Sequence, residues 1–152
     1  MKRFSLHRIA LLITASVALL GGSVEAFGAA RHVGASRAAR VGREFKIKAG
    51  RTATLDGEDL RLKFMRVAAD SRCPKGVECV WAGNAEVLIE VGAKSGRRKS
   101  VLRLNTNASP ERPAESKYGR YTVKLVELSP YPREGRKIAA SAYTVTLLVV
   151  KD

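Results

Sequence analysis

The sequence predicts an all-β domain, either an antiparallel β-sandwich or a small barrel of about seven strands. Three observations support this prediction. Apolar and polar residues alternate with a period of two in several short segments, turn-forming residues separate those segments, and no stretch of ten residues has an apolar period of 3.6. Short strands joined by turns build sandwiches and barrels, whereas parallel sheets need helical crossovers.

The first three predicted strands occupy residues 44–64. Residues 44–49 alternate apolar residues with lysines, and residues 52–55 alternate them with threonines. The sequence Asp56-Gly-Glu-Asp59 follows, in which Asp-Gly supplies the positive φ that a tight hairpin turn requires. Residues 60–64 then alternate leucine and phenylalanine with basic residues, which predicts a third strand with one buried face.

A hairpin is predicted in the middle of the chain. Residues 85–91 alternate apolar residues with glutamates, and residues 92–96 give a glycine-containing turn into a strand at 99–104. We expect these two strands to pair. Residues 94–99 are the closest approach to a basic block in the chain, and we interpret them as a solvated hairpin tip.

Two more strands are predicted in the C-terminal third. Residues 105–119 contain two prolines with Asn, Ser and Gly, so we expect a surface loop or a cross-connection there. Residues 121–128 have strand character, which Ser129-Pro-Tyr-Pro132 ends. The last strand, 143–150, becomes apolar on both faces, so we expect it to be buried on both sides and central in its sheet. Strands of this number and length fit an immunoglobulin-like sandwich.

The N-terminus has the pattern of a secretory signal peptide. Three basic residues precede an apolar run of 12 residues at 9–20, and Val24-Glu25-Ala26 gives a small-residue cleavage pattern. The run is shorter than the roughly 20 residues that a membrane-spanning helix needs. We therefore expect residues 1–26 to be removed, and the mature chain, without a transmembrane segment, to be periplasmic or secreted.

The rest of the chain is expected to form a lead-in and one domain. Residues 27–42 are rich in Gly, Ala, Ser and Arg, which predicts a flexible basic lead-in. Residues 43–152 have the length of a single β domain with one core. The net charge is +14, and removing the signal, with three basic residues and one acidic residue, leaves +12. This charge favours anionic ligands, but the basic residues are dispersed, and no nucleic-acid module or specific nucleic-acid ligand is expected.

The segment 70–83 holds both cysteines and the only tryptophan. In an oxidising compartment the two thiols favour a structural disulfide, Cys73–Cys79, because Pro74 and Gly76 let the short loop double back. Metal or cofactor binding is not expected. A tetrahedral site usually needs four ligands, and both histidines of the chain precede residue 43. The cysteine spacing also differs from that of Cys-x-x-Cys redox pairs.

Other residues of this segment divide into loop-shaping residues and candidate ligand contacts. The loop-shaping residues are Asp70, Pro74, Gly76 and Gly83, and the candidate contacts are Arg72, Lys75 and Trp81. Trp81 follows Cys79 by two positions in an expected short strand, so we expect the indole to be a core plug over the disulfide, with a partly exposed contact as the alternative. Asp70 and Arg72 are expected to hydrogen-bond to each other or to the loop backbone.

The lack of histidine in the predicted domain removes the central group of Ser-His-Asp, Cys-His and zinc-histidine catalysis. Carboxylate pairs remain for an enzyme, and the candidates are Asp56, Glu58, Asp59, Glu86 and Glu90. The first three fall in an expected turn open to water, where the surroundings can shift a carboxyl pKa only a little. We therefore expect a non-catalytic binding module for an unidentified protein or anionic surface ligand. The alternatives are an exported protease inhibitor that presents a stiff loop and a carboxylate-based enzyme.

The motif at residues 70–83 resembles that of a group of small exported bacterial β-domain proteins, which are largely uncharacterised. The shared residues are Asp70-Ser-Arg-Cys-Pro74, the second cysteine, Cys79, and Trp81-Ala-Gly83. The resemblance runs from about Glu44 to the end of the chain and includes Ser129-Pro-Tyr-Pro132. It implies a β-rich exported domain and supplies no catalytic residue.

Overall fold

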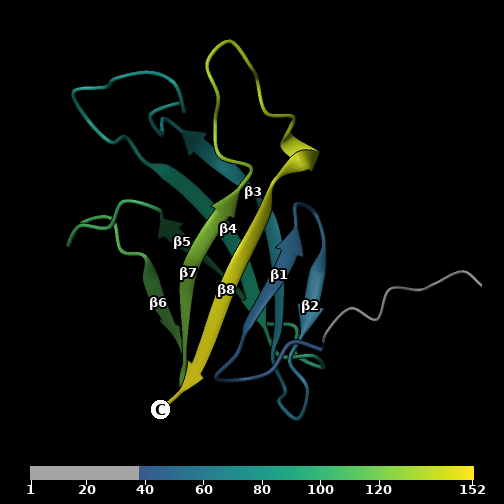
Figure 1. The fold of residues 1–152 in the computed structure, drawn as a ribbon. Coiled ribbons are helices and arrows are strands. Elements are labelled where there is room, and N and C mark those ends of the chain that lie inside the picture. Colours follow the sequence, from purple (N-terminus) through teal and green to yellow (C-terminus); the bar gives the residue numbers. More distant parts are fainter. Residues whose placement is uncertain (1–37) are drawn as a thin grey trace, which may run out of the picture. The chain divides into compact units, whose positions relative to one another are not determined.

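The computed structural model describes residues 38–152, and the expected signal peptide and residues 27–37 lie outside the described residues. The described residues form eight strands and one short 3₁₀ turn, drawn in Figure 1. In chain order these are β1 (Glu44–Lys48), β2 (Thr52–Thr54), β3 (Arg61–Asp70), β4 (Ala85–Gly92), β5 (Lys99–Asn105), β6 (Glu115–Tyr118), β7 (Tyr121–Ser129), η1 (Ala140–Ala142) and β8 (Thr144–Lys151). Within residues 38–152, no helix has the length and apolar character needed to span a bilayer.

The strands form two four-stranded antiparallel sheets, with the orders β1-β8-β7-β6 and β2-β3-β4-β5. Inward side chains of both sheets meet in one apolar core, and neither sheet closes on itself in the described part of the chain. The predicted antiparallel sandwich is therefore confirmed. The expected hairpin of β4 and β5 is also present, with Val87 opposite Leu104.

The core follows from the period-two alternation of the sequence. In β1, for example, Phe45 and Ile47 are buried while the flanking charged residues are exposed. Burying each such side chain contributes about 1.5–3 kcal/mol. The largest fully buried side chains come from both sheets and the turns beside them, and they are Leu55, Leu60, Leu62, Phe64, Val87, Ile89, Val91, Leu104, Val123, Val145, Leu147 and Val149.

The prediction of a loop throughout residues 105–119 was wrong, because β6 lies within that range. Both prolines of the range precede Glu115, so the backbone N–H groups of β6 remain able to pair with β7. Tyr118 lies opposite Tyr121, and Gly119, with a φ of +58°, forms the two-residue turn together with Arg120. The described domain thus has eight strands instead of about seven.

The last strand, β8, is central as predicted, since it lies between β1 and β7. The expectation that both of its faces are buried was wrong at the end of the strand, although Thr146 on the outer face is buried. Val150 on β8 is 41% exposed, because the outer face of a two-layer sandwich has no further layer over it. The strand with the most complete burial is β4, which is buried at six of its eight positions.

Residues 39–42, which the sequence placed in the lead-in, contact the domain. Ala39 is buried in the core and bridges to Leu55, and its carbonyl accepts a hydrogen bond from the backbone N–H of Asp56 at 2.8 Å. The N–H of Gly42 donates to the carbonyl of Val149 at 2.8 Å. The packed domain therefore includes at least Ala39 to Gly42.

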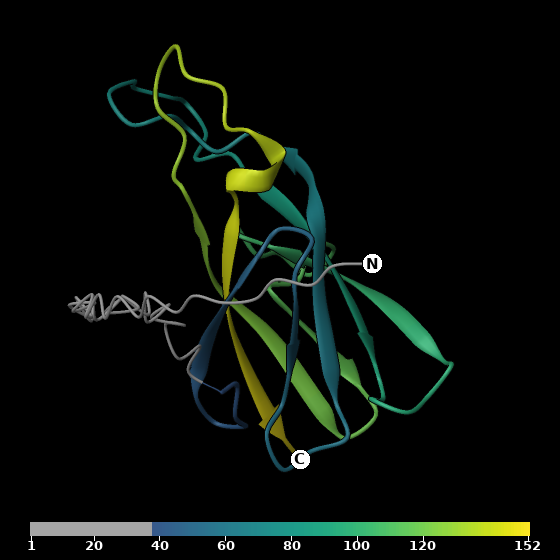
Figure 2. The same cartoon turned by 90° about the vertical axis from the view of Figure 1, so that its right-hand side faces the viewer.

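Two long loops extend beyond the same end of the strands, as Figures 1 and 2 show. Residues 71–84 connect β3 to β4 and are named here the cysteine loop. Residues 130–139 connect β7 to η1 and are named the proline loop. This end of the domain carries the residues that the sequence motif singled out.

Candidate functional site

The cysteine loop and the proline loop are joined to each other through their backbones. The N–H of Lys75 donates to the carbonyl of Pro132 at 2.9 Å, and Lys75 and Arg133 form an isolated parallel bridge. The two loops are 58 positions apart in sequence at this contact but form one surface in the structure.

Arg72 lies at the base of this surface and is the main link between its parts. Its side chain is only 5% exposed. The guanidinium donates through Nε and Nη2 to the two carboxylate oxygens of Asp70 at 2.9 and 2.7 Å. It also donates to the backbone carbonyls of Leu128 at 2.6 Å and Pro130 at 3.0 Å. Because Asp70 ends β3 and Leu128 belongs to β7, this one side chain ties the two sheets together and fixes the start of the proline loop.

Asp70 completes a cluster with Arg72 and Tyr143. The hydroxyl of Tyr143 donates to Oδ2 of Asp70 at 2.9 Å. Burial raises the pKa of Asp70, but hydrogen bonds from Arg72 and Tyr143 outweigh it, so the net pKa lies below the usual value. Burial, together with the hydrogen bond to the carboxylate, raises the pKa of Tyr143. Near neutral pH the cluster therefore holds a carboxylate, a guanidinium and a neutral phenol.

Tyr131 of the proline loop lies between a buried and an exposed cation. The Arg72 guanidinium carbon is 5.0 Å from the ring centroid, and Nζ of Lys75 is 5.6 Å from it. Both distances fit cation–π contacts. Tyr131 thus contacts both the exposed Lys75 and the buried Arg72.

The predicted disulfide between Cys73 and Cys79 is present. The base of the loop is closed by a further backbone hydrogen bond from Cys73 N–H to the carbonyl of Ala82 at 3.0 Å. Gly83 beside it has a φ of +70°, and a Cβ at this position would lie 1.8 Å from the carbonyl oxygen of Ser71. Only glycine permits this close approach of the two loop ends.

The expectation that Trp81 is a core plug was wrong. Trp81 is 81% exposed, and its neighbour Val80 is 89% exposed. The expected short strand that would have aligned Trp81 with Cys79 is absent, since residues 78–81 belong to no strand. Strand side chains already fill the core, whereas residues 80 and 81 lie in a loop beyond the strand ends.

The three residues expected to make contacts are therefore placed differently from one another. Lys75 and Trp81 are exposed on the cysteine loop, while Arg72 is buried and uses its donors on partners within the domain. The tyrosines at positions 131 and 143 were not among the predicted site residues. The only local sign of the first was its place in Ser129-Pro-Tyr-Pro132, and nothing local pairs the second with Asp70.

The candidate catalytic carboxylates pair with basic or hydrogen-bond-donating groups. Each has its own partner: Asp56 pairs with Arg40, Glu58 with Lys151 and Tyr121, Asp59 with the N–H of Lys94, Glu86 with Arg103, and Glu90 with Lys99. Among residues 38–152, no three His, Cys, Asp or Glu side chains are grouped so that they could hold a metal ion.

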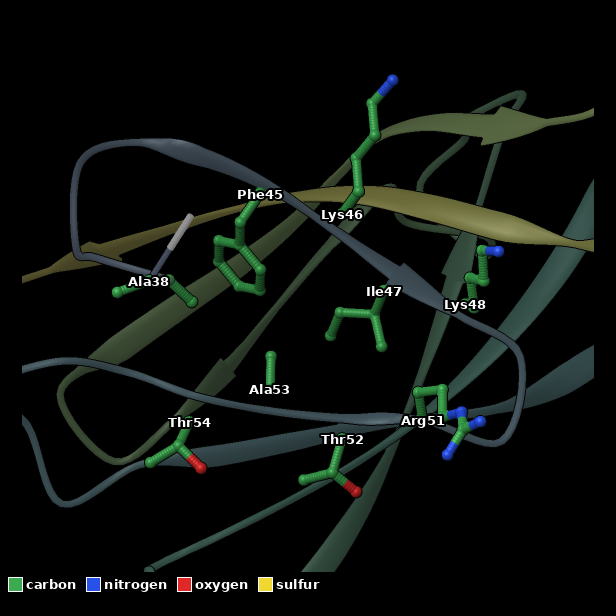
Figure 3. Close-up of a pocket in the computed structure, with 10 residues that line it drawn as sticks. Ala38, Phe45, Lys46, Ile47, Lys48, Arg51, Thr52, Ala53 and Thr54 are labelled. Carbon is green, nitrogen blue, oxygen red and sulfur yellow. The ribbon is translucent and has the colours of Figure 1, made fainter. Parts of the chain in front are cut away.

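A cavity of about 270 Å³ lies away from the two loops, between the edge strands β1 and β2. Figure 3 shows Phe45 and Ile47 of β1 pointing toward the space between the strands and Lys46 pointing away from it. Arg51 and threonines of β2 also line it. It offers a partly apolar floor with basic residues around it, and none of the candidate site residues of segment 70–83 lies there.

The loop surface combines a tightly hydrogen-bonded base with exposed apolar and basic side chains. Its buried ionisable groups are paired with one another, so the exposed side chains are those available to a ligand. No family model matches the chain, and comparisons with curated proteins and with solved structures give no match either.

Proposed function

We propose that this protein is an exported, non-catalytic β-sandwich that binds a ligand through the joined cysteine and proline loops. The observation that carries the proposal is the exposure of Val80 and Trp81, two consecutive large apolar residues on a loop that is fixed at its base. Leaving such side chains in water forgoes about 1.5–3 kcal/mol of burial for each of them. An exposed apolar pair of this kind is typical of an interaction site.

The contact surface consists of this pair together with other exposed side chains of the two joined loops. Its members are Lys75, Val77, Val80, Trp81 and Tyr131. Arg72 is a positioning residue, because it holds Tyr131 and the loop backbones in place without being accessible itself. A surface fixed in this way loses little conformational entropy on binding.

Site-specific crosslinking in the producing cell tests the proposal. A photoreactive amino acid replaces Trp81 in the full-length chain, and the matched control replaces Val101, which is also exposed but lies on β5. We expect crosslinked products at position 81 that are missing at position 101. The same products at both positions, or none at position 81, would refute the proposed surface.

A second candidate function is protease inhibition. It is favoured by the run of exposed residues 75–81 on a disulfide-closed loop, since such a stiff exposed segment can enter an enzyme cleft. A panel of proteases tests it. Inhibition at a one-to-one ratio that disappears on reduction of Cys73–Cys79 would support it, and full activity of every protease would rule it out for that panel.

A further inference from the structure

We infer that the contact surface docks on an anionic lipid bilayer, with Val80 and Trp81 entering the interfacial layer and basic residues of both loops contacting the headgroups. This inference rests on the proposed function and names its ligand class.

The apolar part of the surface fits a bilayer because of its position and chemistry. Both loops project beyond the ends of the strands, so Val80 and Trp81 are borne on a projecting loop (Figures 1 and 2). A planar interface can receive such a projection without a complementary groove. Trp favours the boundary between headgroups and hydrocarbon, because its ring is apolar and its N–H can still be hydrated. The side chain of Val80 adds apolar area and offers no hydrogen-bonding group to a polar ligand.

The charge of the two loops complements an anionic surface. Four exposed basic residues and two exposed acidic residues lie on them, which gives a net charge of +2; they are Lys75, Arg133, Arg136 and Lys137 against Glu78 and Glu134. The buried Arg72 is neutralised by Asp70. Three of the basic residues lie on backbone segments that are joined, since Lys75 bridges to Arg133 and the N–H of Arg136 donates to the carbonyl of Arg133 at 3.1 Å. Basic residues close to a membrane surface attract anionic lipids.

An acidic polysaccharide or a protein partner explains fewer features of this surface than a bilayer does. A soluble polyanion would use the basic residues but leave the exposed valine and tryptophan in water. A protein partner would have to supply a well-packed pocket for the exposed Val80 and Trp81, whereas a bilayer needs no such pocket. A bilayer uses the apolar pair and the basic residues together.

Vesicle binding measured through the single tryptophan tests the inference. The protein is purified after export, and its fluorescence is recorded with phosphatidylglycerol–phosphatidylcholine vesicles and with pure phosphatidylcholine vesicles. Because Trp81 is the only tryptophan, a blue shift reports on the contact surface itself. We expect the shift with the anionic vesicles, and we expect added salt to weaken it.

Vesicle sedimentation of variants adds a quantitative readout. Trp81→Ala should reduce binding about tenfold or more, given the apolar area that it removes. Lys75→Glu reverses one charge and should reduce binding by about tenfold or more at low salt. The matched controls are Val101→Ala on β5 and Lys124→Glu on β7, which change an exposed valine and an exposed lysine elsewhere. Each control should lose less vesicle binding than the loop variant that it matches.

Several results would overturn the inference. These are no fluorescence shift with anionic vesicles, an equal shift with both vesicle types, or a shift with soluble heparin that vesicles do not give. If position 81 crosslinks specifically to a protein while vesicles remain unbound, the binding surface stands and the lipid ligand is refuted. If crosslinking and vesicle binding both fail, the proposed surface falls as well.

Discussion

Replacing Arg72 with methionine tests whether the buried cluster holds the two sheets and the two loops together. Methionine keeps much of the side-chain volume but removes every donor. Asp70, whose side chain is only 11% exposed, then loses its counter-charge, and the carbonyls of Leu128 and Pro130 lose a donor. Removing one partner of a buried ion pair costs about 3–5 kcal/mol. Because the Asp70 carboxylate is not fully enclosed, we expect the lower end, about 3 kcal/mol. For a domain of this size that corresponds to a fall in Tm of about 12 °C.

Urea unfolding at neutral pH measures the loss. Circular dichroism is the suitable signal, since Trp81 is already exposed in the folded protein and its fluorescence would change little. The matched control is Arg103→Met, which breaks the ion pair with Glu86 at a side chain that is 68% exposed. We expect that control to cost less than about 1 kcal/mol.

A double variant shows which lost interaction destabilises Arg72→Met. If the unpaired Asp70 charge is the main cause, the double variant Asp70→Asn with Arg72→Met should recover a substantial part of the lost free energy of unfolding. An Arg72→Met variant that unfolds like Arg103→Met would refute the assigned role of the cluster. No recovery in the double variant would show that the lost carbonyl hydrogen bonds dominate instead.

Three further predictions concern the same end of the domain. Because the pKa of Asp70 is lowered in the folded protein, its carboxylate contributes stability above its ordinary pKa of about 4, and this contribution is lost as the pH falls through the lowered value. Urea unfolding at neutral and strongly acidic pH should therefore show a larger loss for the parent protein than for Asp70→Asn, and equal losses would contradict this. Replacing Cys73 and Cys79 with serine should lower the free energy of unfolding by about 2 kcal/mol, since only a short ring is opened; the far-ultraviolet circular dichroism should stay the same, and its collapse would show that the disulfide holds more than the loop. Gly83→Ala should cost about 1–3 kcal/mol more than Gly57→Ala in thermal unfolding, because both glycines have positive φ but only at Gly83 does a Cβ meet backbone; equal costs would argue against the close approach to Ser71.

Part of the candidate site was predictable from local sequence. The expected export to an oxidising compartment and the short spacer predicted the Cys73–Cys79 bond, and the spacing of two residues allowed the Asp70–Arg72 pair. The positions of Trp81 and Tyr143 were not predictable in this way. Trp81 is apolar enough to suit a core, and only the loop's place beyond the strand ends leaves it exposed. Tyr143 reaches Asp70 across 73 positions of sequence.

The local sequence pattern predicted most of the strands, most of their turns and the all-β class, because period-two alternation and Asp-Gly turns act between residues close in the chain. It missed β6, whose four residues have too little apolar alternation to stand out from the loop around them. The strand order, the burial of Arg72 and the joining of the two loops into one surface follow instead from tertiary contacts. These features depend on which strand ends become neighbours when the sheets pack. Whether a residue at the loop end of the domain is exposed depends on the hydrogen-bond partners and apolar contacts that distant segments supply. No local sequence pattern predicts those contacts.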